Sequence, residues 1–253
     1  MGQSELKMIE LQIKQSSDEW HEHRFRCVTG TKLESAIGAS YSNAKNEWVM
    51  NGKTWVFDGD KLVVDESKKL KPICRKKQNT LLLELVAEHQ SILEIDDYCS
   101  ADMERGNDLE PLSVDAASKK HGVKFETCGM LQSDTYSNFK FSPDAVFKDK
   151  NGVVVGGYET KSKAGKKHIE YMIDGVLPSE HLMQCLCPMI MDDCVKWWLF
   201  GHYDDRNMID PLFTVGIKRE NYEDFINDAR IQLEWFLGEV SETVKKLGGE
   251  YNG

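Results

Sequence analysis

Residues 141–163 read FSPDAVFKDKNGVVVGGYETKSK, and this stretch predicts a β-hairpin. Two short apolar runs, AVF and VVV, flank a polar segment that ends in an Asn-Gly pair, which favours a tight turn between strands. Asp144 opens the first strand, while Glu159 and Lys161 lie two residues apart on the second. Because side chains alternate between the faces of a strand, Glu159 and Lys161 share one face. We therefore expect two carboxylates and an ammonium group to converge.

The rest of the chain predicts helices before and after a cluster of strands, which is typical of a mixed sheet covered by helices. Ser16 or Ser17, Thr31 and Asn221 are the expected N-caps of three helices. Pro111 lies inside a helical pattern and predicts a break next to it. Helices are expected at about 18–26, 32–37, 81–93, 101–119, 179–191 and 221–248, strands at 8–13, 123–131, 195–203 and 213–218, and a basic turn at 163–168.

Composition and charge describe an ordinary folded protein. The 253 residues are 40% hydrophobic and 29% charged, so one domain over residues 1–253 can bury a large core. A net charge of −10 disfavours nucleic-acid binding over the whole surface, but it is compatible with a local basic channel. Lacking a signal peptide or an apolar run of about 18 residues, the chain is expected to be cytoplasmic, without membrane contact.

An ordered insertion is expected at about residues 41–78. This segment is polar and punctuated by glycines, but Trp48 and Trp55 favour a packed structure over a disordered linker. Residues 41–80 contain nine Lys or Arg against five Asp or Glu, a net charge of +4. The insertion is therefore a basic part of an acidic protein.

Seven cysteines are scattered along the chain, and their odd number argues for free thiols in a reducing compartment. Cys185, Cys187 and Cys194 form the closest group, but their spacing fits no zinc site well. We expect these three to be small apolar core residues.

The groups expected at the hairpin suit phosphodiester hydrolysis. Two adjacent carboxylates repel each other, and a divalent cation that prefers oxygen ligands, Mg²⁺ above all, relieves that repulsion. Lys161 could orient the attacking water or stabilise charge, and it could act as a general base only if its pKa is lowered. The alternative is that Asp144 caps a turn and Glu159–Lys161 is a solvated pair on an edge strand.

The order of Ser142-Pro143-Asp144, a hairpin and Glu159-Thr160-Lys161 resembles the PD-(D/E)XK nuclease motif. Further segments in the same order resemble the lambda-exonuclease or YqaJ viral recombinase family, over roughly residues 17–218. The resemblance implies an α/β fold with a restriction-endonuclease-like core, in which a mixed central β-sheet is flanked by helices. The further segments are Trp20–Arg24, Thr29–Thr31, Gly106–Pro111 and Gln184.

For the metal site, the resemblance implies that Asp144, Glu159 and the backbone carbonyl of Thr160 bind Mg²⁺, with Mn²⁺ as a substitute. Lys161 would act on the attacking water. Glu110 matches a helical glutamate near the metal, and its alternative is an exposed helix carboxylate.

A late helix supplies one more candidate. Gln184 matches the first glutamine of a QxQ pattern whose second position here is Leu186. A role for Gln184 on the helix surface or in the core is equally open.

For the DNA end, the resemblance implies that Arg24, Thr31 and Ser142 bind the 5′-phosphate. A helix beginning at Thr31 would present free backbone N–H groups to the anion, and Arg24 could bind phosphate in bidentate fashion. The alternative is that Thr31 only caps its helix. Two basic groups could contact phosphates along a duplex or could be solvated faces. These groups are Lys163, Lys166 and Lys167, and Lys68, Lys69, Lys71 and Arg75–Lys77.

The resemblance implies a Mg²⁺-dependent 5′-to-3′ exonuclease of phage-type recombination that acts on double-stranded DNA ends and leaves 3′ single strands. A homotrimer and a single-strand annealing protein are the partners that it implies. The alternatives are another PD-(D/E)XK nuclease, either an endonuclease or a CRISPR-adaptation-type enzyme with an iron–sulfur cluster, and a non-catalytic protein that binds DNA ends.

Overall fold

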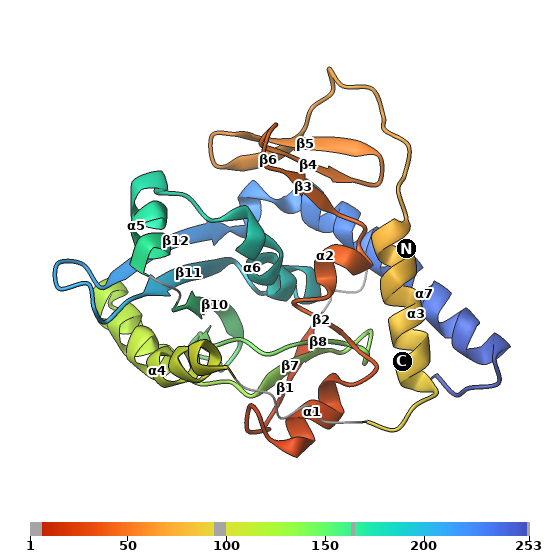
Figure 1. Ribbon diagram of the computed structural model, residues 1–253, viewed down its shortest axis with the longest axis horizontal. Helices are drawn as coiled ribbons and strands as arrows, with labels where there is room; N and C mark the ends of the chain where they lie inside the picture. The colour runs from red at the N-terminus through yellow and green to blue at the C-terminus, as the bar shows by residue number, and fades with distance from the viewer. Residues whose placement is uncertain (1–6, 94–99, 163–164, 252–253) are drawn as a thin grey trace.

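The hairpin expected from the sequence lies at one side of a four-stranded sheet. Residues 7–93, 100–162 and 165–251 are described by the computed structural model in Figure 1. The strand order is β12-β11-β10-β9, with β10 and β11 parallel and the other two pairs antiparallel. The expected mixed sheet is thereby confirmed. Its strands are β9 (Ala145–Lys148), β10 (Val154–Lys161), β11 (Trp197–Tyr203) and β12 (Leu212–Lys218).

The turn of the hairpin is closed by one aspartate. Asp149 Oδ1 accepts hydrogen bonds from the backbone N–H groups of Asn151 and Val153, at 2.8 and 2.9 Å. Gly152 has a φ of 79°, a left-handed conformation that glycine adopts without steric cost. The turn chemistry and the register of Tyr158 opposite Ala145 bring the start of β9 beside the end of β10.

Helices cover both faces of this sheet. The crossover from β10 to β11 passes through α5 (Gly165–Asp174) and α6 (Ser179–Met191), and α6 packs between the sheet and α7 (Glu223–Lys246). The other face contacts α4 (Ala101–His121). Neighbouring residues of β11 therefore enter different cores, with Trp198 and Phe200 on the α6 side and Leu199 on the α4 side.

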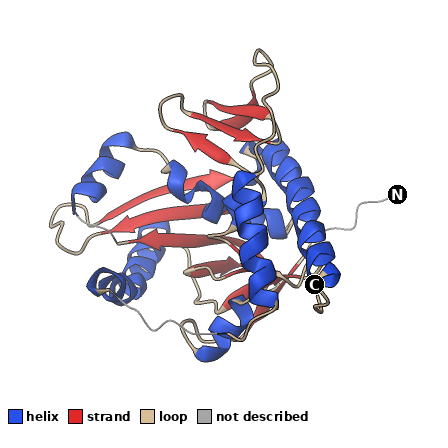
Figure 2. Cartoon of the chain, turned by 45° about the vertical axis from the view of Figure 1, so that its right-hand side comes forward, coloured by secondary structure: helices blue, strands red, loops and turns tan. Residues whose placement is uncertain are grey.

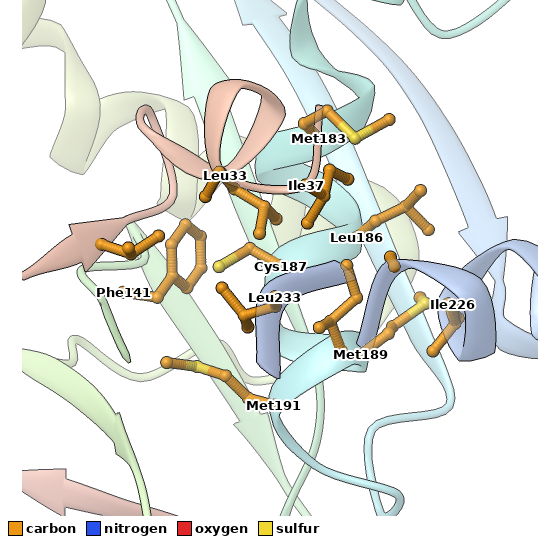
Figure 3. Close-up of a cluster of buried hydrophobic side chains, with 14 of the residues drawn as sticks. Leu33, Ile37, Phe141, Met183, Leu186, Cys187, Met189, Met191, Ile226 and Leu233 are labelled. Carbon is orange, nitrogen blue, oxygen red and sulfur yellow. The ribbon is translucent and has the colours of Figure 1, made fainter. Parts of the chain in front are cut away.

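The core beside α6 joins elements that are distant in sequence. Figure 3 shows Cys187 of α6 among Leu33, Phe141 and Leu233. Cys185 and Cys187 are fully buried, which confirms that they are core residues, whereas Cys194 is partly exposed.

A second sheet leads into the hairpin. Its order is β1-β7-β8-β2, and the short strands β2 and β8 run parallel. β8 ends at Phe141, three residues before Asp144, so this sheet delivers the SPD segment to the start of β9. The strands are β1 (Met8–Leu11), β2 (Val28–Thr29), β7 (Met130–Ser133) and β8 (Phe139–Phe141).

Most of the segment expected to be an insertion, residues 41–78, lies in an ordered antiparallel sheet. Trp48 and Trp55 are buried and pack edge-on against Phe225 of α7. Glu47 is also buried, and hydrogen bonds from Lys68 and then Lys71 hold its pKa at about 2. The sheet comprises β3 (Ser40–Ser42), β4 (Glu47–Met50), β5 (Lys53–Asp58) and β6 (Lys61–Val64). The next helix, α3 (Lys76–His89), lies beside α7, as Figures 1 and 2 show.

Two sequence-based expectations about element interiors were wrong. α4 runs without a break through Pro111. An internal proline removes one backbone hydrogen bond, but the contacts of α4 with β10, β11 and β12 hold the helix together. The strand expected at 123–131 begins only at Met130, because the preceding segment makes a single bridge, between Glu126 and Val146.

The starts of several helices also differ from the expected ones. α1 (Asp18–Arg24) is capped by Ser17, whose hydroxyl accepts from Trp20 N. α2 (Leu33–Ala36) has only four residues and no side-chain cap. α7 follows a short 3₁₀ turn that ends at Asn221, so Tyr222 is its N-cap.

The expected basic turn is partly helical. Within the expected basic turn 163–168, residues 165–168 form the first turn of α5, and Lys163 lies outside the described residues.

In the part of the chain that the structure describes, no helix is long and apolar enough to cross a membrane.

The packing of β10 on β11 generates a stability prediction. A Cβ at Gly201 would lie 1.9 Å from the Tyr158 hydroxyl oxygen, so Gly201→Ala must displace a buried ring. We expect a loss of about 1–3 kcal/mol in the free energy of unfolding, measured by chemical denaturation. Gly238→Ala is the matched control. No atom would touch a Cβ there, and alanine favours the exposed helix, so this variant should be unchanged or more stable. Equal stability of the two variants would contradict the packing argument.

Candidate active site

The hairpin brings Asp144, Glu159 and Lys161 together as the strand period predicts. Lys161 Nζ lies 2.6 Å from Glu159 Oε1, and the Glu159 side chain is only 3% exposed. Asp144 is tied to the same strand, because its Oδ2 accepts a hydrogen bond of 2.5 Å from the backbone N–H of Thr160. The burial of Glu159 rules out a solvated pair on an edge strand.

A third carboxylate reaches the cluster from α4. Burial raises the pKa of Glu110, and the negative charge of Glu159 raises it further. Burial, followed by the charge of Glu159, raises the pKa of Asp144 well above its ordinary value, even though Lys161 and the Thr160 N–H oppose the shift. The three carboxylates therefore lie close enough to repel one another, although Glu110 and Asp144 are 34 residues apart in sequence.

Lys161 is a cation in this arrangement. Burial alone lowers the pKa of its ammonium group, but the charges of Glu159 and Asp144 outweigh burial and place the pKa above its ordinary value. A lysine that acts as a general base needs the opposite shift. The geometry thus favours Lys161 as an electrostatic and orienting group rather than a base.

The oxygen atoms of the cluster fit a divalent cation. Glu159 Oε2 is buried and has no hydrogen-bond partner among the described residues. Asp144 and Glu110 add hard oxygen donors, the type that Mg²⁺ prefers. Among the described residues no group of three or more His, Cys, Asp or Glu side chains is arranged to hold a metal on its own. Mg²⁺ characteristically uses one or two carboxylates and completes its shell with water and phosphate oxygens, so this donor set is compatible with it.

A buried hydroxyl network supports the cluster, and sequence reasoning missed it. Ser113 Oγ lies 2.7 Å from Tyr158 Oη and 2.6 Å from Thr160 Oγ1, and all three residues are buried. Ser113 follows Glu110 by three residues, so both lie on the same face of α4. In the sequence, the role of Ser113 could have been inferred from its position three residues after Glu110 in a predicted helix. The network fixes α4 against β10 at the position where Glu110 meets Glu159.

Two residues expected to bind the DNA end meet beside the cluster. Arg24 Nη1 lies 3.5 Å from Ser142 Oγ, although 118 residues separate them. Trp20 joins them, because its indole N–H donates to Ser142 Oγ at 2.8 Å and its ring centroid lies 4.2 Å from the Arg24 guanidinium carbon. The sequence placed Trp20 in the motif but indicated no role for it.

Thr31 differs from the expectation in one respect. It caps no helix, since α2 begins at Leu33 without a side-chain cap, and its hydroxyl instead lies 3.1 Å from that of Thr29. A helix of four residues offers no substantial dipole, so the argument from a helix N-terminus fails. Because β2 and β8 run parallel, Thr31 and Ser142 both follow strand ends at one edge of the sheet.

Gln184 contacts another residue of its own helix, α6. Its amide oxygen lies 3.4 Å from His181 Nδ1, and within the described residues it makes no hydrogen bond to Asp144, Glu159 or Lys161. Leu186 is buried in the core. The charge of Glu159 reaches two fully buried thiols of α6, Cys185 and Cys187, and burial raises the pKa of each well above its usual range.

Much of the basic sequence is paired inside the protein. Lys68 and Lys71 bind Glu47, and Lys77 lies 2.6 Å from Glu34. The Arg75 guanidinium lies 3.6 Å from the centre of the Trp235 ring. The run 68–77 is therefore not a free cationic strip, and its expected contact with DNA stays a prediction. In the other basic group, Lys166 and Lys167 both lie within 4 Å of Glu170.

A hairpin that carries Asp, Glu and Lys on a mixed sheet is the arrangement of the PD-(D/E)XK motif. Residues 19–194 match the YqaJ-like viral recombinase domain, and the chain belongs to this family. No curated protein matches the chain significantly.

The fold is similar to two crystal structures of one enzyme. The first is an alkaline exonuclease (LHK-Exo) from Laribacter hongkongensis, with 21% identity and a TM-score of 0.66 over 92% of this chain and 96% of that one. The second is LHK-Exo in complex with dAMP, with 21% identity and a TM-score of 0.65 over 91% and 96%. At this identity the likeness establishes the fold alone.

The repulsion at Asp144 predicts a stability effect in the absence of metal. A carboxyl with a raised pKa binds its proton more tightly in the folded state, so it costs stability as pH rises through that pKa. In chelator at pH 8, Asp144→Asn should therefore melt at a higher temperature than the wild type, and the difference should shrink toward pH 4.

Asp149→Asn is the control of opposite sign. Hydrogen bonds in the turn, from Val153 first, lower the pKa of Asp149, so this carboxylate stabilises the fold at neutral pH and the effect is lost as pH falls. The Asn variant should melt lower than the wild type at pH 8. An Asp144→Asn protein that is less stable than the wild type in chelator at pH 8 would contradict the proposed repulsion.

Proposed function

We propose that this protein is a Mg²⁺-dependent exonuclease that degrades double-stranded DNA from 5′ ends and leaves 3′ single strands for recombination. The observation that carries the proposal is the buried, unpaired Oε2 of Glu159, next to Asp144 and the ammonium of Lys161. Membership of the YqaJ-like viral recombinase family and the fold shared with an alkaline exonuclease support the same reading.

The residues of the cluster divide the chemistry between them. Asp144, Glu159 and the Thr160 carbonyl would hold Mg²⁺, or Mn²⁺ in its place. Such an ion polarises a phosphoryl group and acidifies bound water. Lys161 orients the attacking water and offsets the negative charge that develops on the phosphate. Glu110 adds negative charge on the α4 side and strengthens the attraction for a cation. Gln184 stays a weaker candidate.

Recognition of the DNA end follows from the position of Arg24. Its guanidinium lies over Trp20 and beside Ser142, and among the described residues no carboxylate lies within 4 Å of it. A largely buried guanidinium without a counter-ion suits a phosphate that arrives with the substrate. Thr31 would contribute a hydroxyl from the neighbouring strand end.

The assembly and location form part of the same proposal. A homotrimer, a single-strand annealing protein as partner and a cytoplasmic location agree with the family resemblance. Gel filtration with light scattering tests the trimer directly. A monomer that digests DNA would remove the trimer and leave the chemistry of the site intact.

The first functional prediction concerns the hydrolytic groups. Asp144→Ala and Lys161→Ala should each lower the rate of linear duplex digestion in Mg²⁺ by at least about 10²-fold, because each removes charge complementarity at the phosphoryl group. Lys148→Met is the control, since Lys148 binds Glu10 and Glu126 away from the cluster. Retention of wild-type rates by either alanine variant, with folding verified by circular dichroism, would refute the assigned site.

The second functional prediction concerns the DNA end. The protein should digest 5′-phosphorylated linear duplex faster than 5′-hydroxyl duplex, and it should leave covalently closed circles intact. Arg24→Gln should reduce the preference for phosphate by roughly tenfold, the size of effect expected for one charge-assisted hydrogen bond. Rapid cutting of closed circles, or equal rates on both ends by the wild type, would count against exonuclease action from a phosphorylated end.

A further inference from the structure

Lys140 is a buried lysine beneath the proposed phosphate pocket. It is 8% exposed and lies on β8, two residues before Ser142. Residues two apart on an extended chain point to the same side, so Lys140 and Ser142 both face α1. The ammonium nitrogen lies 2.9 Å from the backbone carbonyl oxygen of His23 and 3.5 Å from His23 Nδ1. Lys140 thus holds the last turn of α1, which carries Arg24.

The charge of Lys140 has no counter-ion in the part of the chain that the structure describes. Among the described residues, neither Lys140 nor Arg24 has a carboxylate within 4 Å, whereas Lys32, Lys148 and Lys161 are each paired with a glutamate. Lys148, for example, lies 2.6 Å from Glu10. Burial of an ammonium group without a counter-ion opposes folding. An anion that binds with the substrate would offset that cost, and the hydrogen-bond partner of Lys140, His23, directly precedes Arg24 on α1.

We propose that Lys140 is a positioning residue for the terminal 5′-phosphate, which fixes the α1 turn that carries Arg24 and adds a second, buried positive charge under the pocket. In a site shielded from water, such a charge acts over a longer range than it would at the surface. The inference rests on the proposed recognition of 5′-phosphorylated ends, and it adds a residue for which the sequence motif indicates no role.

Three substitutions separate the two parts of this role. Lys140→Arg keeps the charge and a donor, Lys140→Gln keeps a donor without charge, and Lys140→Met removes both. In the last case the His23 carbonyl still accepts from the Cys27 thiol at 3.3 Å, so it is not left without a partner. Lys148→Met is the matched control, because it removes a half-buried lysine that is already paired.

The experiment measures digestion rates on one duplex with either a 5′-phosphate or a 5′-hydroxyl end, and compares the ratio between variants. We expect the ratio to fall by about threefold in Lys140→Gln, which loses only the charge, and by about tenfold in Lys140→Met, which also loses the hydrogen bond to His23. It should be largely kept in Lys140→Arg and unchanged in Lys148→Met. A wild-type ratio in Lys140→Gln and Lys140→Met overturns the proposal and leaves the nuclease assignment standing. A wild-type protein that digests both ends equally refutes the phosphate pocket itself.

The melting temperature of the protein without DNA distinguishes this role from a purely structural one, because the two roles predict changes of opposite sign when Lys140 is replaced. Because an unpaired buried charge opposes folding, Lys140→Met should melt at or above the wild-type temperature. A lysine kept for packing alone would give a lower melting temperature in the neutral variants. Clear destabilisation or failure to fold in both neutral variants therefore assigns Lys140 to the scaffold and overturns the proposal.

Discussion

Three carboxylates held around one ammonium group are the constraint on which the rest of the site depends. Glu110, Asp144 and Glu159 come from different segments, and the charge of Lys161 offsets part of their repulsion. The surrounding fold holds them there, through the Thr160 N–H on Asp144 and the buried Ser113 hydroxyl between α4 and β10. The concentration of negative charge lowers the stability of the fold, and a bound cation would offset that loss.

The proposed phosphate-binding residues carry the opposite charge. Arg24 lies on the last turn of α1 and Lys140 on the strand beneath it, and neither has a carboxylate within 4 Å in the described part of the chain. The acidic cluster and this basic group are linked by three residues of chain, from Ser142 to Asp144. A phosphodiester chain whose end bound to Arg24 would thus meet electrostatic fields of opposite sign within a short distance. The net charge of −10 describes neither region.

Sequence reasoning predicted the parts that depend on local chemistry. The hairpin, the shared face of Glu159 and Lys161, and the bounds of α6 follow from turn residues and periodicity. It failed where distant contacts decide, as when packing on the sheet keeps α4 intact through Pro111. The same limit applies to the basic insertion, because the pairing of its lysines with Glu47 depends on the folded sheet. The roles of Trp20 and Lys140 likewise arise from contacts more than 100 residues apart.

The hairpin turn closed by Asp149 also bears on how the protein folds. Asp144 and Thr160 are separated by only 16 positions, so the loop that joins them closes at a small entropic cost. The parallel pairing of β10 with β11 is a contact of much longer range, because the two helices of the crossover separate these strands in sequence. Such contacts form more slowly. The carboxylates of Asp144 and Glu159 would therefore meet early, before the hydrophobic layers that bury them are complete, because few residues separate them in the motif.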